Sequence, residues 1–183
     1  MGIPAGDPFA RGDQSELIEQ LPKVWIGYLF ALATFAGEAI AVSRHPELMK
    51  ARGLVVPPLE IYLPAFVGLV YWLVCVHRYH VVLSKVPGWK HPITPNKGVW
   101  FHFIPLFNFY WVFRWPEAIA SFVNQRVGRP EMKGWVVGVG FLASALCRLL
   151  VDAALGLGIL FFTCSYISAH LRRALGSTAP QGQ

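Results

Sequence analysis

The sequence predicts an all-α polytopic membrane protein, with four transmembrane helices and a re-entrant or interfacial helical hairpin on the cytoplasmic side. Composition is the first reason. Of 183 residues, 55% are apolar and 14% charged, and the mean hydropathy is +0.46, a balance typical of multi-pass membrane proteins. The second reason is that apolar residues gather in segments of about 20, the length with which a helix crosses the hydrocarbon of a bilayer. Residues 24–173 are expected to form a single helical membrane domain.

The chain begins with a polar, net acidic stretch, residues 1–23, which is expected to be a cytoplasmic N-terminal segment. Within it, residues 15–21 are expected to form one or two amphipathic turns. The first span covers residues 24–43 and carries one charge, Glu38, near its end. A carboxyl there serves either as a proton or ion site, or as a group that reaches the interface or pairs locally. The second span covers residues 60–83.

A re-entrant or interfacial stretch is expected at residues 98–126, because Pro105 and Asn108 interrupt its apolar part. Pro105 would remove a hydrogen bond from the middle of a helix that is already short for a span. Trp100 and Trp111 flank the interruption, and indole rings prefer the membrane interface. The chain is therefore expected to dip into the membrane, turn between Pro105 and Asn108, and return.

The second half of this stretch has the pattern of a helix that lies in the interface. Pro116 is expected to be its first residue, because proline is favoured at the first position of a helix. Residues 117–126 then place apolar side chains on one side and polar ones on the other. The preceding residues, 85–97, are expected to be a loop.

The last apolar region, residues 134–170, would be about 55 Å long as one helix, too long for a single crossing. We divide it at its only charges, Arg148 and Asp152, into spans at residues 134–149 and 152–171. Asp152 is expected to cap the second helix and to pair with Arg148, four residues away. Small residues recur every fourth position on both helices, which favours close association of the pair.

The distribution of basic residues favours four spans over five. If residues 98–113 cross the membrane there are five spans, and the loops carry six Lys and Arg on one side against nine on the other. If the stretch re-enters there are four spans, and the count is eleven against four. Because basic residues concentrate in cytoplasmic loops, both termini are expected to be cytoplasmic. Residues 174–183 are then expected to be a flexible tail.

Several motifs lie close together in the middle of the chain: Trp72 to Arg78, Thr94-Pro95, Phe103-Ile104-Pro105 and Asn108-Phe109. Over about residues 60–171 the chain resembles a bacterial family of four-span membrane proteins catalogued as a domain of unknown function. In that family a tryptophan-rich second helix ending in arginine leads into a T/S-P…F-I/V-P-x-x-N-L segment, a polar helix and a final helical hairpin. The chain departs from the family at Val112, where a proline is usual, and in a shorter last loop. The resemblance implies four spans in a bacterial cytoplasmic (inner) membrane. The family has no agreed catalytic activity, so the resemblance bears on architecture and not on function.

Histidines supply the candidate ligands for a cofactor. In the four-span topology, His77, His80, His102 and His170 lie on the same side, where imidazoles from several helices are candidates for binding haem or a metal ion. No carboxylate or cysteine completes the set at ligand spacing, and His77 and His80 beside Arg78 also suit a helix end at the interface. We therefore expect no metal and no cofactor.

Neither catalysis nor nucleic-acid binding is indicated. The chain has no G-x-S-x-G, no H-E-x-x-H and no cluster of acids, so no catalytic residue is expected. The formal charge of +6 is spread between apolar segments, which suits topology and contacts with anionic lipid rather than nucleic acid.

The leading functional hypothesis is a non-enzymatic accessory or scaffold subunit of a membrane complex. Its partners would be the lipid bilayer and either other membrane protein subunits or further copies of the chain. One alternative is a small transporter or pore-forming protein that uses the re-entrant segment, with Asn108 and Glu38 as its polar groups. In the first reading Asn108 only caps the turn. A second alternative is a haem-binding electron-transfer subunit.

Overall fold

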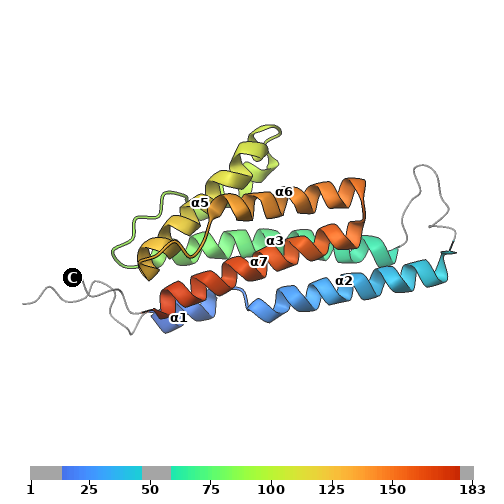
Figure 1. Cartoon of the computed structure of the whole chain (residues 1–183), viewed down its shortest axis with the longest axis horizontal. Coiled ribbons are helices and arrows are strands. Elements are labelled where there is room, and N and C mark those ends of the chain that lie inside the picture. The colour runs from blue at the N-terminus through green and yellow to red at the C-terminus, as the bar shows by residue number, and fades with distance from the viewer. Residues whose placement is uncertain (1–13, 47–58, 178–183) are drawn as a thin grey trace, which may run out of the picture.

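The computed structural model describes residues 14–46 and 59–177, and every regular element within these ranges is helical (Figure 1). The elements are α1 (Gln14–Gln20), α2 (Val24–Arg44), α3 (Leu59–Lys85), α4 (Pro95–Trp100), the 3-10 helix η2 (Phe101–Phe103), α5 (Phe107–Val127), α6 (Gly134–Leu150) and α7 (Ala153–Gly176). The all-α prediction is confirmed for the described part of the chain.

Helices α2, α3, α6 and α7 lie side by side, and α7 contacts the other three (Figure 1). Helix α7 runs opposite to α2, because the Ser165 hydroxyl donates a hydrogen bond to the Val24 carbonyl at 2.9 Å and Arg172 donates to the Leu21 carbonyl at 2.7 Å. We call the end of the bundle with α1 and the last turns of α3 and α7 the termini end. The opposite end, where α6 turns into α7, is the far end.

The helices follow the predicted segments closely. Residues 24–43, 60–83 and 134–149 correspond to α2, α3 and α6 within two residues at each end. The last helix is longer than predicted, because α7 continues to Gly176. Ala174 and Leu175 are buried, so the expectation of a flexible tail is wrong for residues 174–176. Because Ala174 and Leu175 pack in the core, the helix continues past residue 171, where the last span was expected to end.

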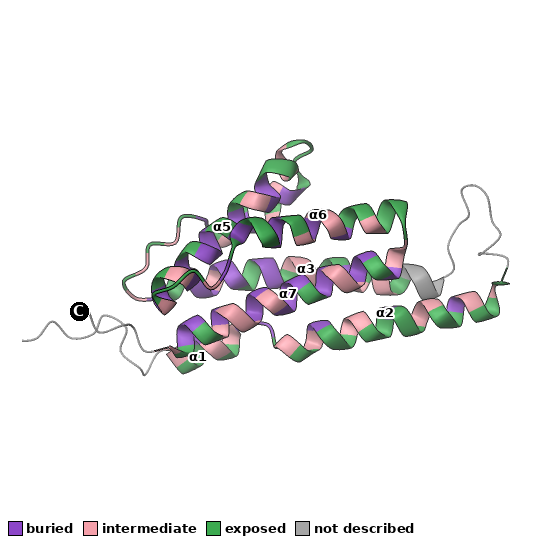
Figure 2. Ribbon diagram, in the orientation of Figure 1, coloured by how far each residue is buried: buried purple, intermediate pink, exposed green. Residues whose placement is uncertain are grey.

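Three helical segments are long and apolar enough to cross a membrane: Gln14–Arg44, Phe66–Lys85 and Ala153–Gly176. Helix α6 is also apolar but has 17 residues. The outer face of α2 is covered with exposed side chains such as Trp25, Leu29 and Leu32, whereas α7 is buried on most sides (Figure 2). An apolar surface of this extent is what a lipid-facing helix presents.

Short helix α1 closes the termini end. Leu17 and Leu21 are buried, as the predicted amphipathic turns require. The carbonyl of Gln20 accepts a hydrogen bond from Arg78 at 3.3 Å, and its side chain accepts one from Lys85 at 2.9 Å. These contacts hold the segment before α2 against the last turns of α3.

The stretch from α4 to α5 forms a helical hairpin, residues 95–127, which leaves the termini end and returns to it (Figure 1). Thr94 caps α4 by accepting a hydrogen bond from the Lys97 amide at 3.4 Å, with Pro95 in the first turn. The first three residues of α4 fall in the loop predicted at residues 85–97, although threonine followed by proline is a signal for the start of a helix. The chain reverses at Leu106, whose φ of 63° lies in the left-handed region and which falls within the turn predicted between Pro105 and Asn108.

Helix α5 differs from the prediction. It was expected to begin at Pro116, but it runs unbroken from Phe107 to Val127 with the proline inside. A proline within a helix costs about 3 kcal/mol through a lost hydrogen bond and a clash with the preceding turn. Trp115, Pro116 and Ile119 are all buried, so burial on both sides of the proline offsets this cost. The predicted apolar side of residues 117–126 does face the core.

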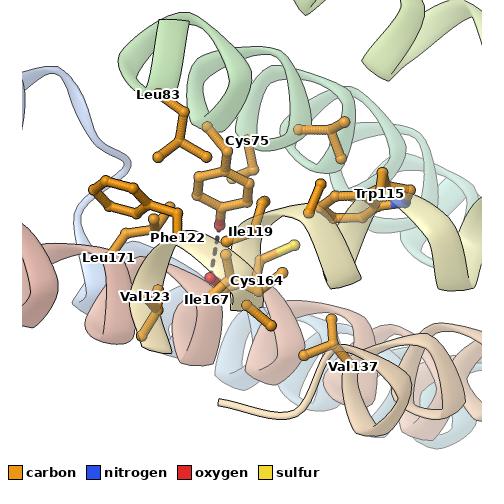
Figure 3. Close-up of a cluster of buried hydrophobic side chains, with 14 of the residues drawn as sticks. Cys75, Leu83, Trp115, Ile119, Phe122, Val123, Val137, Cys164, Ile167 and Leu171 are labelled. Carbon is orange, nitrogen blue, oxygen red and sulfur yellow. Dashed lines mark hydrogen bonds between the residues drawn. The ribbon is translucent and has the colours of Figure 1, made fainter. Parts of the chain in front are cut away.

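A cluster of buried side chains lies where α3, α5 and α7 meet (Figure 3). Tyr79, fully buried, donates a hydrogen bond to the Cys164 carbonyl at 2.7 Å and shares another with the Ser168 hydroxyl at 2.9 Å. Around this pair lie side chains that Figure 3 labels, including Leu83, Ile119 and Ile167, each with no measurable exposure. The hairpin is therefore part of the same core as the bundle.

Small residues make the close helix contacts. A side chain at Gly138 would collide with Phe113 of α5, and one at Gly156 would collide with the backbone of α6. The Ser144 hydroxyl donates a hydrogen bond to the Gly156 carbonyl at 2.7 Å, and Gly140 lies against Thr163, so one small face of α6 meets α7. The other predicted small positions meet different helices, because Gly138 packs on α5 and Gly158 lies against Phe35 of α2. These faces are used within the chain.

Candidate functional site

The reversal of the hairpin lies about halfway along the bundle. The ring of His102, in η2, stands edge-on to Trp72 of α3 with ring centroids 4.7 Å apart. The indole of Trp111 donates a hydrogen bond to the Gly98 carbonyl at 3.3 Å and so joins the two arms of the hairpin. A side chain at Gly98 would meet the ring of His80, which explains how closely α4 approaches α3.

The two tryptophans expected at the membrane interface differ in exposure. Trp100 is 67% exposed, whereas Trp111 is 5% exposed. The prediction that Trp111 marks the surface of the hairpin is wrong, because the continuous helix α5 turns its side chain inward. The rest of the exposed apolar surface at the hairpin tip comes from large residues around the turn: Phe103, Ile104, Leu106, Phe109 and Tyr110.

Behind this tip lies a cavity of about 310 Å³ between α3, the hairpin, α6 and α7, which we call the tip cavity. Most of its wall is apolar and includes Phe141, Leu142 and Leu160. Five residues with polar side chains also line it: Trp72, His102, Asn108, Ser144 and Arg148.

Three polar atoms of this wall have no hydrogen-bond partner. They are Nε1 of Trp72, Nε2 of His102 and Oδ1 of Asn108, and each atom is buried. A buried polar atom without a partner costs about 1–3 kcal/mol, so three in one cavity wall are unusual. The hypothesis that Asn108 caps the turn is not supported, since Leu106 occupies the cap position and no side chain caps α5 there.

The hydrogen bonding of His102 indicates what its free nitrogen can do. Nδ1 of His102 lies 3.3 Å from the Val99 carbonyl, to which it donates. In the neutral ring that burial favours, Nε2 is then an acceptor. Trp72 Nε1 is a donor by its chemistry and Asn108 Oδ1 an acceptor. The cavity wall thus offers one donor and two acceptors.

The four histidines singled out in the sequence do not come together. His80 Nδ1 lies 2.7 Å from Nε2 of His91, a residue in the loop before α4. His77 is exposed at the termini end. His170 lies against Tyr166, and its Nδ1 is 3.8 Å from the Glu131 carboxylate, in the loop before α6. In the described ranges no group of three or more histidine, cysteine or acidic residues could hold a metal ion.

His91 was not among the predicted site residues, because a single histidine in a loop has no periodicity that would associate it with α3. The Trp89 indole lies 3.5 Å from His91 Nδ1, to which it donates. Burial lowers the pKa of His91 to about 4. The loop before the hairpin is therefore fastened to α3 by a neutral imidazole pair.

At the far end, Asp152 caps α7 as predicted, accepting a hydrogen bond from the Leu155 amide at 2.6 Å. The expected ion pair between Asp152 and Arg148 is absent, because the carboxylate is turned toward the start of α7 and Arg148 lines the tip cavity instead. The carboxyl of Glu38 comes within hydrogen-bonding reach of Asp152, so α2 contacts the turn between α6 and α7.

An ionic cluster lies at the termini end. Glu131, in the loop before α6, pairs with Arg173 of α7 and with Arg129, and its pKa is lowered chiefly by the bond to Arg173. Asn124 holds the same loop: its Oδ1 accepts hydrogen bonds from the amides of Glu131 and Met132, both at 2.8 Å. Its Nδ2 donates to the Met132 carbonyl, also at 2.8 Å.

A wider, open groove of about 860 Å³ lies at the junction of α1 and α2. Lys23 and Arg172 line it together with Trp25 and Tyr28. Cations beside aromatic rings are typical of the membrane–water interface. Among its described lining residues, one unpaired buried atom is found, Nε of Arg172, against three in the wall of the tip cavity. The tip cavity is therefore the stronger candidate site.

No protein-family model, no curated protein and no solved structure matches the chain. The class of protein is described from the structure of the chain. It is all-helical over the described residues, with three helices that could cross a membrane. Its candidate site is a cavity beside a helical hairpin.

Proposed function

We propose that the protein is a multi-pass protein of the bacterial cytoplasmic membrane, in which α2, α3, α6 and α7 cross the bilayer and the hairpin re-enters from the cytoplasmic side. Both arms of the hairpin join the termini end, and its tip reaches only the middle of the bundle, beside Trp72. In this topology eleven basic residues face the cytoplasm and four the other side, in accord with the positive-inside rule. The exposed residues of the tip then lie in lipid or against a partner.

Single cysteines in a variant without the three native ones distinguish four spans from five. Lys90→Cys, Gln125→Cys and Val151→Cys all replace residues that are exposed. With four spans, positions 90 and 125 react with a membrane-impermeant maleimide from the cytoplasmic side only, and position 151 from the other side. With five spans, 90 and 151 react from one side and 125 from the opposite side.

The role proposed for this architecture is that of a non-enzymatic accessory subunit, which holds a partner membrane protein through the hairpin tip. The observation that carries the proposal is the tip itself: Phe103, Leu106 and Phe109 are 55%, 82% and 64% exposed, although the residues of the hairpin behind them are buried in the core. The small faces of α6 and α7 are already used inside the chain, which leaves the aromatic tip as the free docking element.

Native purification in a mild detergent tests this role, with every stoichiometric companion identified by mass spectrometry. We expect a defined complex that Phe109→Ser disrupts. The matched control is Trp25→Ser, which removes a similarly exposed aromatic residue, 58% exposed, from α2. A chain that purifies alone, or a partner retained equally by both variants, would contradict the proposal.

A transport function is the second candidate, and the unpaired Oδ1 of Asn108 in the cavity wall favours it. Flux of small solutes into liposomes that contain the purified protein, compared with Asn108→Ala and Glu38→Gln, separates the two. Flux that a well-folded variant loses would replace the accessory role by transport.

A further inference from the structure

We propose that the tip cavity binds a lipid alcohol, an amphiphile dissolved in the bilayer with an uncharged hydroxyl head and an apolar tail. The inference does not need the accessory role, because it starts from the inner wall of the hairpin; the two surfaces share Phe109, which belongs to the exposed tip and also lines the cavity. It starts from the three unpaired polar atoms and the apolar remainder of the same wall.

The head group follows from the hydrogen-bonding capacity of the wall. Trp72 Nε1 is a free donor, while His102 Nε2 and Asn108 Oδ1 are free acceptors. The oxygen of one hydroxyl group can accept a hydrogen bond from Trp72 Nε1, and its proton can be donated to His102 Nε2 or to Asn108 Oδ1. An ether or ester could satisfy only the donor, and an ammonium group only the acceptors.

The tail follows from the volume and lining of the cavity. About 310 Å³ would hold on the order of ten waters at ~30 Å³ each, but every water needs two to four polar partners. Phe141, Leu142 and Leu160 provide none, so an apolar chain fills this part of the cavity better. Leu149 and Phe109, which also line the cavity, are 80% and 64% exposed and form an apolar rim that faces lipid in the proposed topology.

An anionic head would not fit the same atoms. Arg148 is the only charged residue of the wall, and it belongs to the last turn of α6 and is exposed. A carboxylate or phosphate placed on Arg148 would leave Asn108 and His102 without a donor. The neutral head is therefore the better match, and the charged head is a measurable alternative.

The test is photo-crosslinking of the full-length protein in phosphatidylcholine vesicles with a dodecanol that carries a diazirine in its chain. Labelled peptides are expected from the beginning of α5 and the second half of α6. Unlabelled dodecanol should displace the probe at a concentration at least about tenfold lower than dodecane or dodecanoate. Equal displacement by all three would show a merely apolar cavity, and preferential displacement by dodecanoate would show an anion site on Arg148; either result overturns the proposal.

Variants test the head contacts separately. Trp72→Phe removes the donor and should raise the concentration of dodecanol needed for half-displacement by about five- to tenfold, the value of one hydrogen bond. Asn108→Leu removes an acceptor at nearly constant volume and should act in the same direction. Trp135→Phe, at an exposed site on α6 outside the cavity, is the control and should change nothing. Unchanged displacement in well-folded Trp72→Phe and Asn108→Leu proteins would refute the assigned head contacts.

Discussion

Replacement of Asn124 by alanine should unfold the termini-end loop and destabilise the protein by about 3 kcal/mol. The Asn124 side chain makes three hydrogen bonds of 2.8 Å to the backbone of residues 131 and 132. Each is worth about 1 kcal/mol net, and the groups left without partners add to the cost. Met132 is 1% exposed, so water does not easily replace the lost amide.

The effect can be measured by denaturant titration and by thermal unfolding of the purified protein in detergent, followed by circular dichroism. At about 2–4 °C per kcal/mol for a chain of this size, Asn124→Ala should lower the Tm by about 6–12 °C. Asn124→Asp retains the two acceptor contacts and should fall between wild type and alanine. Gln125→Ala, at the exposed neighbouring position, should stay within about 0.5 kcal/mol of wild type. If Asn124→Ala and Gln125→Ala are equally stable, the side chain does not hold the loop.

Three further predictions use other contacts. Gly98→Ala should destabilise the protein by about 1–3 kcal/mol, since the new methyl group would collide with His80, whereas Gly176→Ala, with nothing within 4 Å, should be neutral; unfolding titrations compare the two. The folded-state pKa of His91, about 4, is below the unfolded value, so its contribution to stability is present above about pH 6.5 and is lost as pH falls toward 4; His91→Gln should flatten this decline. Tyr79→Phe should cost about 1–3 kcal/mol, because the Cys164 carbonyl in the core loses its hydroxyl partner; a smaller loss in equilibrium unfolding would contradict this.

The identity and limits of most helices could be predicted, because they depend on residues close together in sequence. Runs of apolar residues of helix length placed α2, α3 and α6, and Asp152 marked the start of α7 through a local cap. The reversal of the hairpin could also be predicted from local sequence, because Pro105 and Asn108 interrupt an apolar run on either side of Leu106.

The errors concern residues whose environment is set by distant parts of the chain. Pro116 has the local signature of a helix start, but burial of α5 against α6 and α7 keeps the helix continuous through it. Trp111 has the composition of an interfacial residue, yet the direction of α5 places it in the core. Arg148 and Asp152 have the spacing of an ion pair, but the Asp152 carboxylate caps α7 instead.

The sequence by itself determined the all-helical character of residues 14–46 and 59–177, the positions of the long apolar helices and a reversal near Pro105, since each follows from local composition and backbone chemistry. Only the tertiary structure decided the pairing of His80 with His91 and the gathering of Trp72, His102 and Asn108 around one cavity. Those neighbours depend on the relative rotation and depth of α3 and the hairpin. That register is set by side-chain interlocking over the whole bundle, which no short stretch of sequence encodes.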